Sequence, residues 1–315
     1  MTLPKDASPI SQRVPISTSS VQPGARRASE FGGIAQLLAG RYGPHAPGDW
    51  ALIADEGPQG HSSATTLARL FAHRSVRRYQ QQELEPGTLE LLVAAAQSAA
   101  SSSNLQLWSV LSVEDPESRR ALSEVAGNQA HVRQCPLFLV WIADLHRAGK
   151  LAVARGLESE GLGYTESFLV ASVDAALAAQ NAVVAAEALG LGTVYIGALR
   201  NQPERVAEIL GLPPNTFAVF GLCVGWPDPI AATAVKPRLP QSVVLHRDRY
   251  TFAEPEHAAV ASYDELMRTF YAEQKMPVPN HGWAWQSAQR FVNAKALNGR
   301  HLLRDALKRL GFELK

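Results

Sequence analysis

The chain has 315 residues, which is enough for one large domain or for two modest domains. Thirty basic and twenty-nine acidic residues give a net charge of +1, so the composition excludes a general electrostatic attraction to nucleic acid or to anionic lipid. No uninterrupted apolar stretch approaches the roughly 20 residues that a membrane span needs. We therefore expect a cytoplasmic protein that binds neither nucleic acid nor membrane. Its two cysteines, Cys135 and Cys223, lie in apolar runs and suit a reducing compartment.

The N-terminal part of the chain carries no chemistry that the sequence identifies. Residues 1–29 are rich in Ser, Pro, Gln and Arg, and this composition predicts a disordered tail. Two short helical patterns follow, at 31–42 and 64–72, on either side of a loop rich in Gly and Pro. We treat residues 30–69 as an extension of unknown role.

A basic segment comes next. The stretch HRSVRRY, residues 73–79, places three arginines and one histidine in seven residues. Its alternating pattern predicts a short extended segment, with Ser75 and Arg77 on one side and Arg74 and Arg78 on the other.

Helix and strand patterns then alternate. Pro86 opens an apolar helix that ends in the small polar run SSSN at 101–104. Two strands are predicted at 107–113 and 136–144, with a helix and the loop AGNQAHV (126–132) between them. The second strand is apolar on both faces, which favours a central, covered position in a sheet.

The middle of the chain continues with an alanine-dense helix at 172–190, which we expect to be buried at a subunit contact. A strand TVYIGAL (193–199), a helix from Pro203 to Leu210 and a strand at 217–226 follow. These spacings do not repeat as regular βαβ units, so we predict an α+β sandwich with one mixed sheet. Three further elements complete the chain: the stretch KPRLP at 236–240, a long helix near 254–275 and a final amphipathic helix at 301–312.

Several common enzyme motifs are absent. The glycines of GLGTVYIG, at 190, 192 and 197, follow a helix and precede a strand, whereas the dinucleotide fingerprint needs a strand followed by a helix. The sequence contains no G-x-S-x-G, H-E-x-x-H, P-loop or C-x-x-C motif. It therefore gives no support for a hydrolase, a metal site or a P-loop NTPase.

Two basic patches remain, HRSVR and KPRLP. Each patch alone is typical of a solvated surface. Arginine side chains, however, bind phosphate oxygens in a bidentate manner, and Pro237 and Pro240 fix the loop that carries Lys236 and Arg238. Together with the hydroxyl groups of SSSN, the two patches would suit one phosphate monoester.

The order of these motifs resembles the flavin-dependent nitroreductase superfamily, and most closely its NADPH-dependent oxygen-insensitive nitroreductase and flavin reductase branch. The resemblance rests on HRSVR, SSSNLQ, AGNQAHV, AAQNAVVAAEALGLGTVYIGALRN, GLCVGWPD and KPRLP, and it runs from about Leu70 to the C-terminus. It implies an FMN-binding domain at 70–315 with a C-terminal helical extension. The implied fold is a three-layer sandwich, with a mixed, mainly antiparallel sheet flanked by helices, in a domain-intertwined homodimer.

The resemblance also implies roles for individual residues. The phosphate of FMN would be bound by His73, Arg74, Ser75, Lys236 and Arg238. The flavin ring and ribityl chain would contact Arg77, Ser101, Ser102, Ser103, Gln129, Tyr195, Ile196 and Gly197. Substrate or NADPH would meet Asn104, Lys275 and Arg300, although Lys275 and Arg300 could equally be ordinary surface residues. Ala198 stands where the family often has a second glycine.

The implied activity is two-electron reduction in two half-reactions, with FMN bound, NADPH or NADH as donor, and a nitroaromatic, a quinone or free flavin as small-molecule acceptor. The reactive atoms belong to the cofactor, so no catalytic acid, base or nucleophile is assigned. Two alternatives stay open. One is a specialised flavin enzyme of the same superfamily, such as a dehalogenase or an ene reductase. The other is a flavin-binding regulatory protein without turnover.

Overall fold

The computed structural model describes residues 39–40, 42–43, 61–231, 233–252, 254–276 and 282–315. The tail predicted for residues 1–29 lies outside the described residues, as does most of the helical pattern at 31–42. The second N-terminal helix is confirmed as α3, His61–Phe71.

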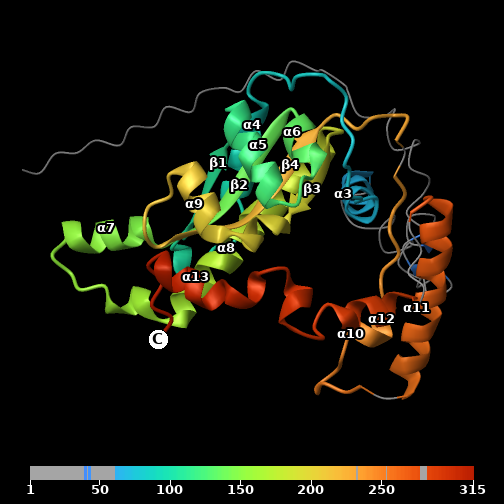
Figure 1. Cartoon of the computed structure of the whole chain (residues 1–315). Helices are drawn as coiled ribbons and strands as arrows, with labels where there is room; N and C mark the ends of the chain where they lie inside the picture. The colour runs from blue at the N-terminus through green and yellow to red at the C-terminus, as the bar shows by residue number, and fades with distance from the viewer. Residues whose placement is uncertain (1–38, 41, 44–60, 232, 253, 277–281) are drawn as a thin grey trace, which may run out of the picture.

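A four-stranded sheet forms the centre of the fold (Figure 1). Its strands are β1 (Trp108–Ser112), β2 (Leu137–Asp144), β3 (Gly192–Ile196) and β4 (Thr216–Gly225). They lie in the order β1-β2-β4-β3, and each neighbouring pair is antiparallel. Every residue of β2 is buried, which confirms the covered position that its two apolar faces predict.

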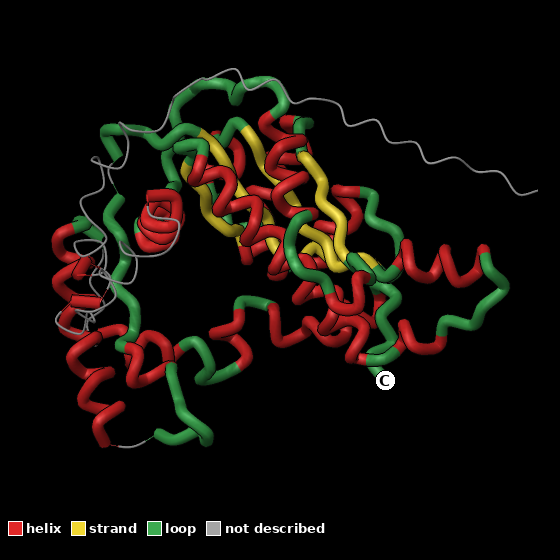
Figure 2. The backbone as a smooth tube through the Cα atoms, turned by 180° about the vertical axis from the view of Figure 1, so that it is seen from behind, coloured by secondary structure: helices red, strands yellow, loops and turns green. Residues whose placement is uncertain are grey.

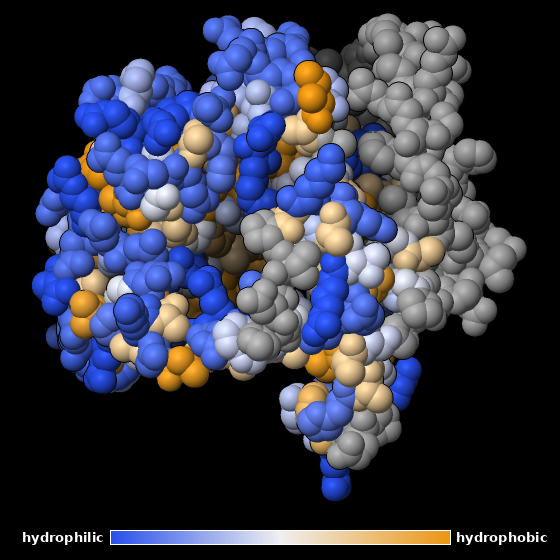
Figure 3. Space-filling view, turned by 45° about the vertical axis from the view of Figure 1, so that its right-hand side comes forward, coloured by the Kyte–Doolittle hydropathy of each residue, from blue (hydrophilic) through white to orange (hydrophobic). Residues whose placement is uncertain are grey.

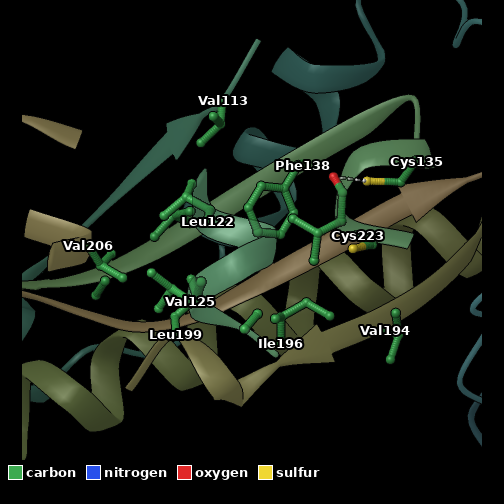
Figure 4. Packing of buried hydrophobic residues seen from close by; sticks show 14 of the residues in the cluster. Val113, Leu122, Val125, Cys135, Phe138, Val194, Ile196, Leu199, Val206 and Cys223 are labelled. Atoms are coloured by element: carbon green, nitrogen blue, oxygen red, sulfur yellow. Dashed lines mark hydrogen bonds between the residues drawn. The ribbon is translucent and has the colours of Figure 1, made fainter. Parts of the chain in front are cut away.

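Helices cover both faces of the sheet. One face packs on α4 (Thr88–Gln97) and α8 (Thr165–Ala188). The other packs on α5 (Pro116–Val125), α6 (Ala130–Gln134) and α9 (Pro203–Leu210). Side chains of β2 alternate between the two clusters: Leu137, Leu139 and Trp141 point to the first, and Phe138, Val140 and Ile142 point to the second. Figure 4 shows the second cluster, in which Phe138 lies with Leu122 and Val125 of α5. The predicted α+β class is confirmed.

Helix α8 is long and apolar enough to cross a membrane, by length and composition alone. In the fold it is a core helix, because alanines along it pack against β2, β4 and α4. It also carries the buried carboxylate of Asp174. The face of the molecule in Figure 3 is mainly hydrophilic, and apolar residues occur there in small separate groups.

The basic segment 73–79 lies along the edge of the sheet. Ser75 forms a parallel bridge with Thr193 of β3, and the backbone N–H of Val76 donates to the carbonyl of Thr193 at 2.9 Å. Val76 and Tyr79 are buried and anchor the segment in the core. The predicted extended conformation is therefore confirmed, and it is the only parallel pairing to the sheet among the described residues.

Gly192 makes this anchoring possible. A Cβ atom at Gly192 would lie 2.6 Å from Cγ2 of Val76, closer than packed carbon atoms approach one another. Gly192→Ala is expected to lower the free energy of unfolding by about 1–3 kcal/mol, because the added methyl group overpacks the contact. A urea titration measures the change. Gly161→Ala is the control, since no atom lies within 4 Å of a Cβ there; equal midpoints for the two variants would contradict the prediction.

The C-terminal part leaves the sandwich and then returns to it (Figures 1 and 2). Helices α10 (Gln241–Val244), α11 (Glu254–Glu273) and α12 (Gly282–Gln289) lie apart from the sheet. Tyr263, Met267 and Phe270 form a separate small core there. Helix α13 (Leu303–Arg309) returns to the sandwich, where Leu307 and Phe312 pack with Phe217. On the opposite side α7 (His146–Ala154) projects from the sandwich.

Three local predictions need correction. The helix predicted to open at Pro86 begins at Thr88, because Gly87 at φ 83° interrupts the chain before it. The loop predicted at 126–132 ends early, since α6 begins at Ala130. The strand predicted at 193–199 ends at Ile196, the last residue of β3 that pairs with β4, and a 3₁₀ turn, η5 (Gly197–Asn201), follows.

Candidate active site

The first basic patch lies where α8 ends and β3 begins. Nδ1 of His73 lies 2.6 Å from Oε1 of Glu187, near the end of α8. Nη1 of Arg69 donates to the carbonyls of Glu187 and Ala188, which lie in the last turn of α8 at the negative end of the helix dipole. Arg74 lines a small cavity of about 70 Å³ beside these residues. Glu187 and Arg69 therefore fix the backbone and side chains around the start of HRSVR.

The second basic patch lies close enough to the first for the charge of Arg77 to act on Lys236. Burial lowers the pKa of Lys236, and the positive charges of Arg77 and Arg238 lower it further. Burial followed by the charge of Arg77 also lowers the pKa of His131, in α6. The charge of Arg77 therefore acts both on the KPRLP loop and on α6. The two patches, about 160 positions apart in the chain, approach each other through Arg77 and Lys236.

The cations of the two patches have no acidic partner within the part of the chain that the structure describes. Among the described residues, neither Arg77, Lys236 nor Arg238 forms an ion pair. The Nζ atom of Lys236 lies 5.9 Å from the ring centroid of Tyr271, and Arg238 donates only to carbonyls of its own loop. Of the three, Lys236 is partly buried, whereas Arg77 and Arg238 are exposed. Positive charges that are gathered in this way repel one another unless an anion joins them. The residues present fit the phosphate ester of a bound FMN.

The SSSN run forms the 3₁₀ turn η3 (Ser102–Asn104), and Asp174 of α8 shapes it. The carboxylate of Asp174, 1% exposed, accepts hydrogen bonds from Ser101 Oγ at 2.7 Å, Ser102 N at 3.1 Å and Leu107 N at 3.1 Å. The backbone of Ser103 and Asn104 is left-handed, which costs energy for residues with a side chain. Asp174 therefore stabilises a loop whose backbone conformation is strained. The hydroxyl of Ser101 takes part in this by donating to Asp174.

The predicted ring contacts lie at the end of β3. The hydroxyl of Tyr195 donates to Gln180 Oε1 at 3.3 Å, and its ring packs edge-on against Phe220 at 4.9 Å. Burial, followed by the charge of Glu187, raises the pKa of Tyr195, which keeps the phenol protonated at neutral pH. Ile196 is buried, and Gly197 begins η5. A Cβ at Gly197 would lie 3.1 Å from a nitrogen of Arg200.

Gln129 caps the start of α6, two residues before His131. Its Nε2 donates to the carbonyl of Ala126 at 2.8 Å. Gln129 therefore precedes the helix in which the charge of Arg77 lowers the pKa of His131.

Comparison with known proteins decides the family. The model of the nitroreductase family matches residues 70–226, and the model of its C-terminal domain matches residues 236–315. The chain belongs to the nitroreductase family. The resemblance predicted from the motifs is confirmed, as is the NADPH-dependent branch.

Known members of the nitroreductase family align with most of the length of this chain. It is 38% identical to an FMN reductase (NADPH) of Bacillus subtilis over 249 residues, which are 78% of this chain and 98% of the relative. It is 37% identical to an oxygen-insensitive NADPH nitroreductase of Salmonella typhimurium, over 70% of this chain and 88% of the relative. The structure of an NADPH:FMN oxidoreductase from Vibrio harveyi complexed with NAD+ matches with a TM-score of 0.70 at 33% identity, covering 79% of this chain and 99% of the other.

The three residues predicted to contact substrate or NADPH lie in different parts of this nitroreductase structure. Asn104 is exposed at the tip of η3. Arg300 lies against η5, where its Nε donates to Asn201 Oδ1 at 2.9 Å. Lys275 follows α11 in the C-terminal arm, and no described contact joins it to Arg300. The structure therefore brings Arg300 to the end of η5, the turn that follows the YIG strand, whereas no described hydrogen bond or ion pair links Lys275 to this turn.

Sequence reasoning missed Asp174 and Glu187. Both are acids on an alanine-rich helix whose other residues are mostly small and apolar, and this contrast is the one signal that could have marked them. Their partners are 73 and 114 positions away in the chain, so spacing could not have found the pairs.

Proposed function

We propose that the chain is an FMN-dependent NAD(P)H oxidoreductase that binds the FMN phosphate between the HRSVR and KPRLP segments. The observation that carries this proposal is that Lys236 lies within reach of the charges of Arg77 and Arg238, while none of the three forms an ion pair among the described residues. Membership of the nitroreductase family and the relatives named FMN reductase and NADPH nitroreductase support it independently.

In this proposal, each residue predicted to bind the cofactor contacts a particular part of FMN. Guanidinium, ammonium and hydroxyl groups donate to the phosphate oxygens, and backbone and small side chains border the rest of the cofactor. The phosphate contacts are His73, Arg74, Ser75, Lys236 and Arg238. The contacts along the ring and ribityl chain are Arg77, Ser101, Ser102, Ser103, Gln129, Tyr195, Ile196 and Gly197.

The chemistry that bound FMN supplies is a two-electron exchange at one site, with hydride taken from NADPH or NADH and then given to a nitroaromatic, a quinone or free flavin. With FMN bound, the guanidinium of Arg77 would lie where it can stabilise negative charge on the pyrimidine edge of the ring. The absence of a side chain at Gly197 leaves room for the guanidinium of Arg200, from which a Cβ would lie only 3.1 Å. Glu187 holds the imidazole of His73 in place beside the phosphate.

A homodimer is part of the same proposal. Leu169, Val173 and Leu177 of α8 are spaced four residues apart and are 42–55% exposed, so they form an apolar stripe on one face of the helix. A second copy of the chain would cover this stripe. The enzyme would act in the cytoplasm, where the buried free thiols of Cys135 and Cys223 stay reduced.

An anaerobic spectrum tests the proposal. The purified protein should show flavin absorbance in the visible range, and NADPH or NADH added under argon should bleach it. A quinone added afterwards should restore the colour. A protein that keeps its colour with both nicotinamides binds flavin without turnover, and a colourless protein that takes up no FMN would refute the proposal altogether.

A further inference from the structure

The two cysteines of the chain lie together in the core, on the face of the sheet that packs on α5, α6 and α9. Cys135 follows the end of α6 and is 1% exposed, and Cys223 lies in β4 and is 0% exposed. Both are free thiols, and Figure 4 shows their sulfur atoms within the same cluster. No role proposed above uses the chemistry of these thiols.

Both sulfur atoms lie against the same turn of α6. The thiol of Cys135 donates to the carbonyl of Val132 at 3.7 Å, and the thiol of Cys223 donates to the carbonyl of His131 at 3.6 Å. Because these carbonyls belong to consecutive residues, sulfur atoms from distant parts of the chain meet at one place. The two side chains also interact directly by a hydrogen bond. The thiols therefore form a pair that ties α6 to β4.

The surroundings of the two thiols differ. Hydrogen bonding to Cys223 lowers the pKa of Cys135 against the effect of burial, and the positive charge of Arg119 adds to the lowering. Arg119 is fixed there, because it donates to the carbonyls of Cys135 at 2.6 Å and of Pro136 at 3.1 Å. Burial raises the pKa of Cys223. Since the thiolate is the reactive form, Cys135 is the nucleophile of the pair and Cys223 is its partner.

We propose that Cys135 and Cys223 are a redox modification site, a dithiol that hydrogen peroxide converts to an intramolecular disulfide. The thiolate sulfur of Cys135 attacks one peroxide oxygen, the O–O bond breaks, and a sulfenic acid and hydroxide form. The sulfur of Cys223 then attacks the sulfenic sulfur, the S–S bond forms, and the sulfenic oxygen leaves as water. The proton of Cys223 converts the hydroxide to a second water, so two thiols lose the two electrons that the peroxide gains.

Burial decides which product forms. A sulfenic acid condenses with any thiol that reaches it, but the packed cluster around Cys135 keeps bulky thiols such as glutathione away. Cys223 is the only other cysteine of the chain and already lies beside Cys135. Peroxide is small and enters through local opening of the core, so oxidation is slower than that of an exposed thiol.

The disulfide would change the contacts of α6. Both S–H donors are lost on oxidation, so the carbonyls of His131 and Val132 lose the hydrogen bonds that tie them to the sulfur atoms. Gln129, one of the ring contacts in our proposal, immediately precedes this helix. The consequence rests on the proposed FMN site: the oxidised protein should hold FMN less tightly than the reduced protein.

The test treats the FMN-loaded wild-type protein with hydrogen peroxide, alkylates the remaining thiols in denaturant and maps the peptides by mass spectrometry. We expect the peptides that contain Cys135 and Cys223 to be joined with the loss of two hydrogen atoms, and dithiothreitol to restore both thiols. Alkylation at both cysteines after the treatment, or oxygen added to Cys135 without a joined peptide, would overturn the proposal.

Cys223→Ser provides the matched control, because its hydroxyl can still donate to the carbonyl of His131. Peroxide should raise the FMN dissociation constant of the wild type roughly two- to tenfold, the effect of losing about one hydrogen bond, and leave that of Cys223→Ser unchanged. A mapped disulfide without any change in FMN affinity would refute the link to α6. A failure of the oxidoreductase proposal is distinct, because the untreated protein would then bind no FMN, whereas the disulfide is mapped without flavin.

Discussion

Alanine at position 74 or at position 238 is expected to weaken FMN binding roughly 10- to 150-fold in each variant. A hydrogen bond between a guanidinium group and a phosphate contributes about 1.5–3 kcal/mol, and this free energy converts to that range of affinity. The loss should be large at both positions because no acidic side chain of the described residues pairs with either arginine and competes for it. Titration of the apoprotein with FMN, followed by flavin fluorescence, measures the dissociation constants.

Arg78→Ala provides the matched control for this prediction. Arg78 is an exposed arginine of the same basic segment, and it has no assigned contact with the cofactor. Its FMN affinity should stay within about twofold of the wild type, because the phosphate is held by its neighbours. Wild-type affinity in both Arg74→Ala and Arg238→Ala would place the phosphate elsewhere.

Asp174→Asn is expected to lower the free energy of unfolding by about 2–4 kcal/mol, because three donors lose a charged acceptor in a buried position. The amide keeps one oxygen but turns an NH₂ group towards at least one of these donors. For a chain of this size we expect the melting temperature to fall by roughly 5–10 °C. Differential scanning calorimetry of the holoenzyme gives the change in melting temperature.

The same substitution should also affect the cofactor. Asp174 holds the loop that carries Ser101 and Ser102, so FMN should dissociate more easily from Asp174→Asn than from the wild type. Glu166→Gln, an exposed acid on the same helix, should change stability by less than about 1 kcal/mol. An Asp174→Asn protein that melts with the wild type would show that the loop does not depend on this carboxylate.

The regular elements could be predicted from the sequence because their patterns reflect their surroundings. The run at 136–144 is apolar on both faces, and β2 is buried on both faces. The helix at Pro203–Leu210 begins at a proline and ends before a left-handed glycine, Gly211, so both of its limits are local signals. HRSVRRY was predicted as extended for the same kind of reason, since its alternation is visible within seven residues.

The remaining features depend on contacts between distant parts of the chain. Glu187 meets His73, Asp174 meets the SSSN loop, and Arg300 meets Asn201, and each pair is separated by at least 70 positions. The packing of the sheet, rather than any local pattern, brings these partners together. Ends of elements were also missed where one backbone conformation decides them, as Gly87 does before α4.

The comparison of FMN with riboflavin as ligands of the apoprotein tests the central claim most directly, because the two molecules differ only by the phosphate. If Arg74, Lys236 and Arg238 bind that phosphate, FMN should bind at least roughly 100-fold more tightly than riboflavin, which corresponds to about two charge-assisted contacts at the lower end of their range. Equal dissociation constants for FMN and riboflavin would contradict the account, since the basic segments would then contribute nothing to cofactor binding.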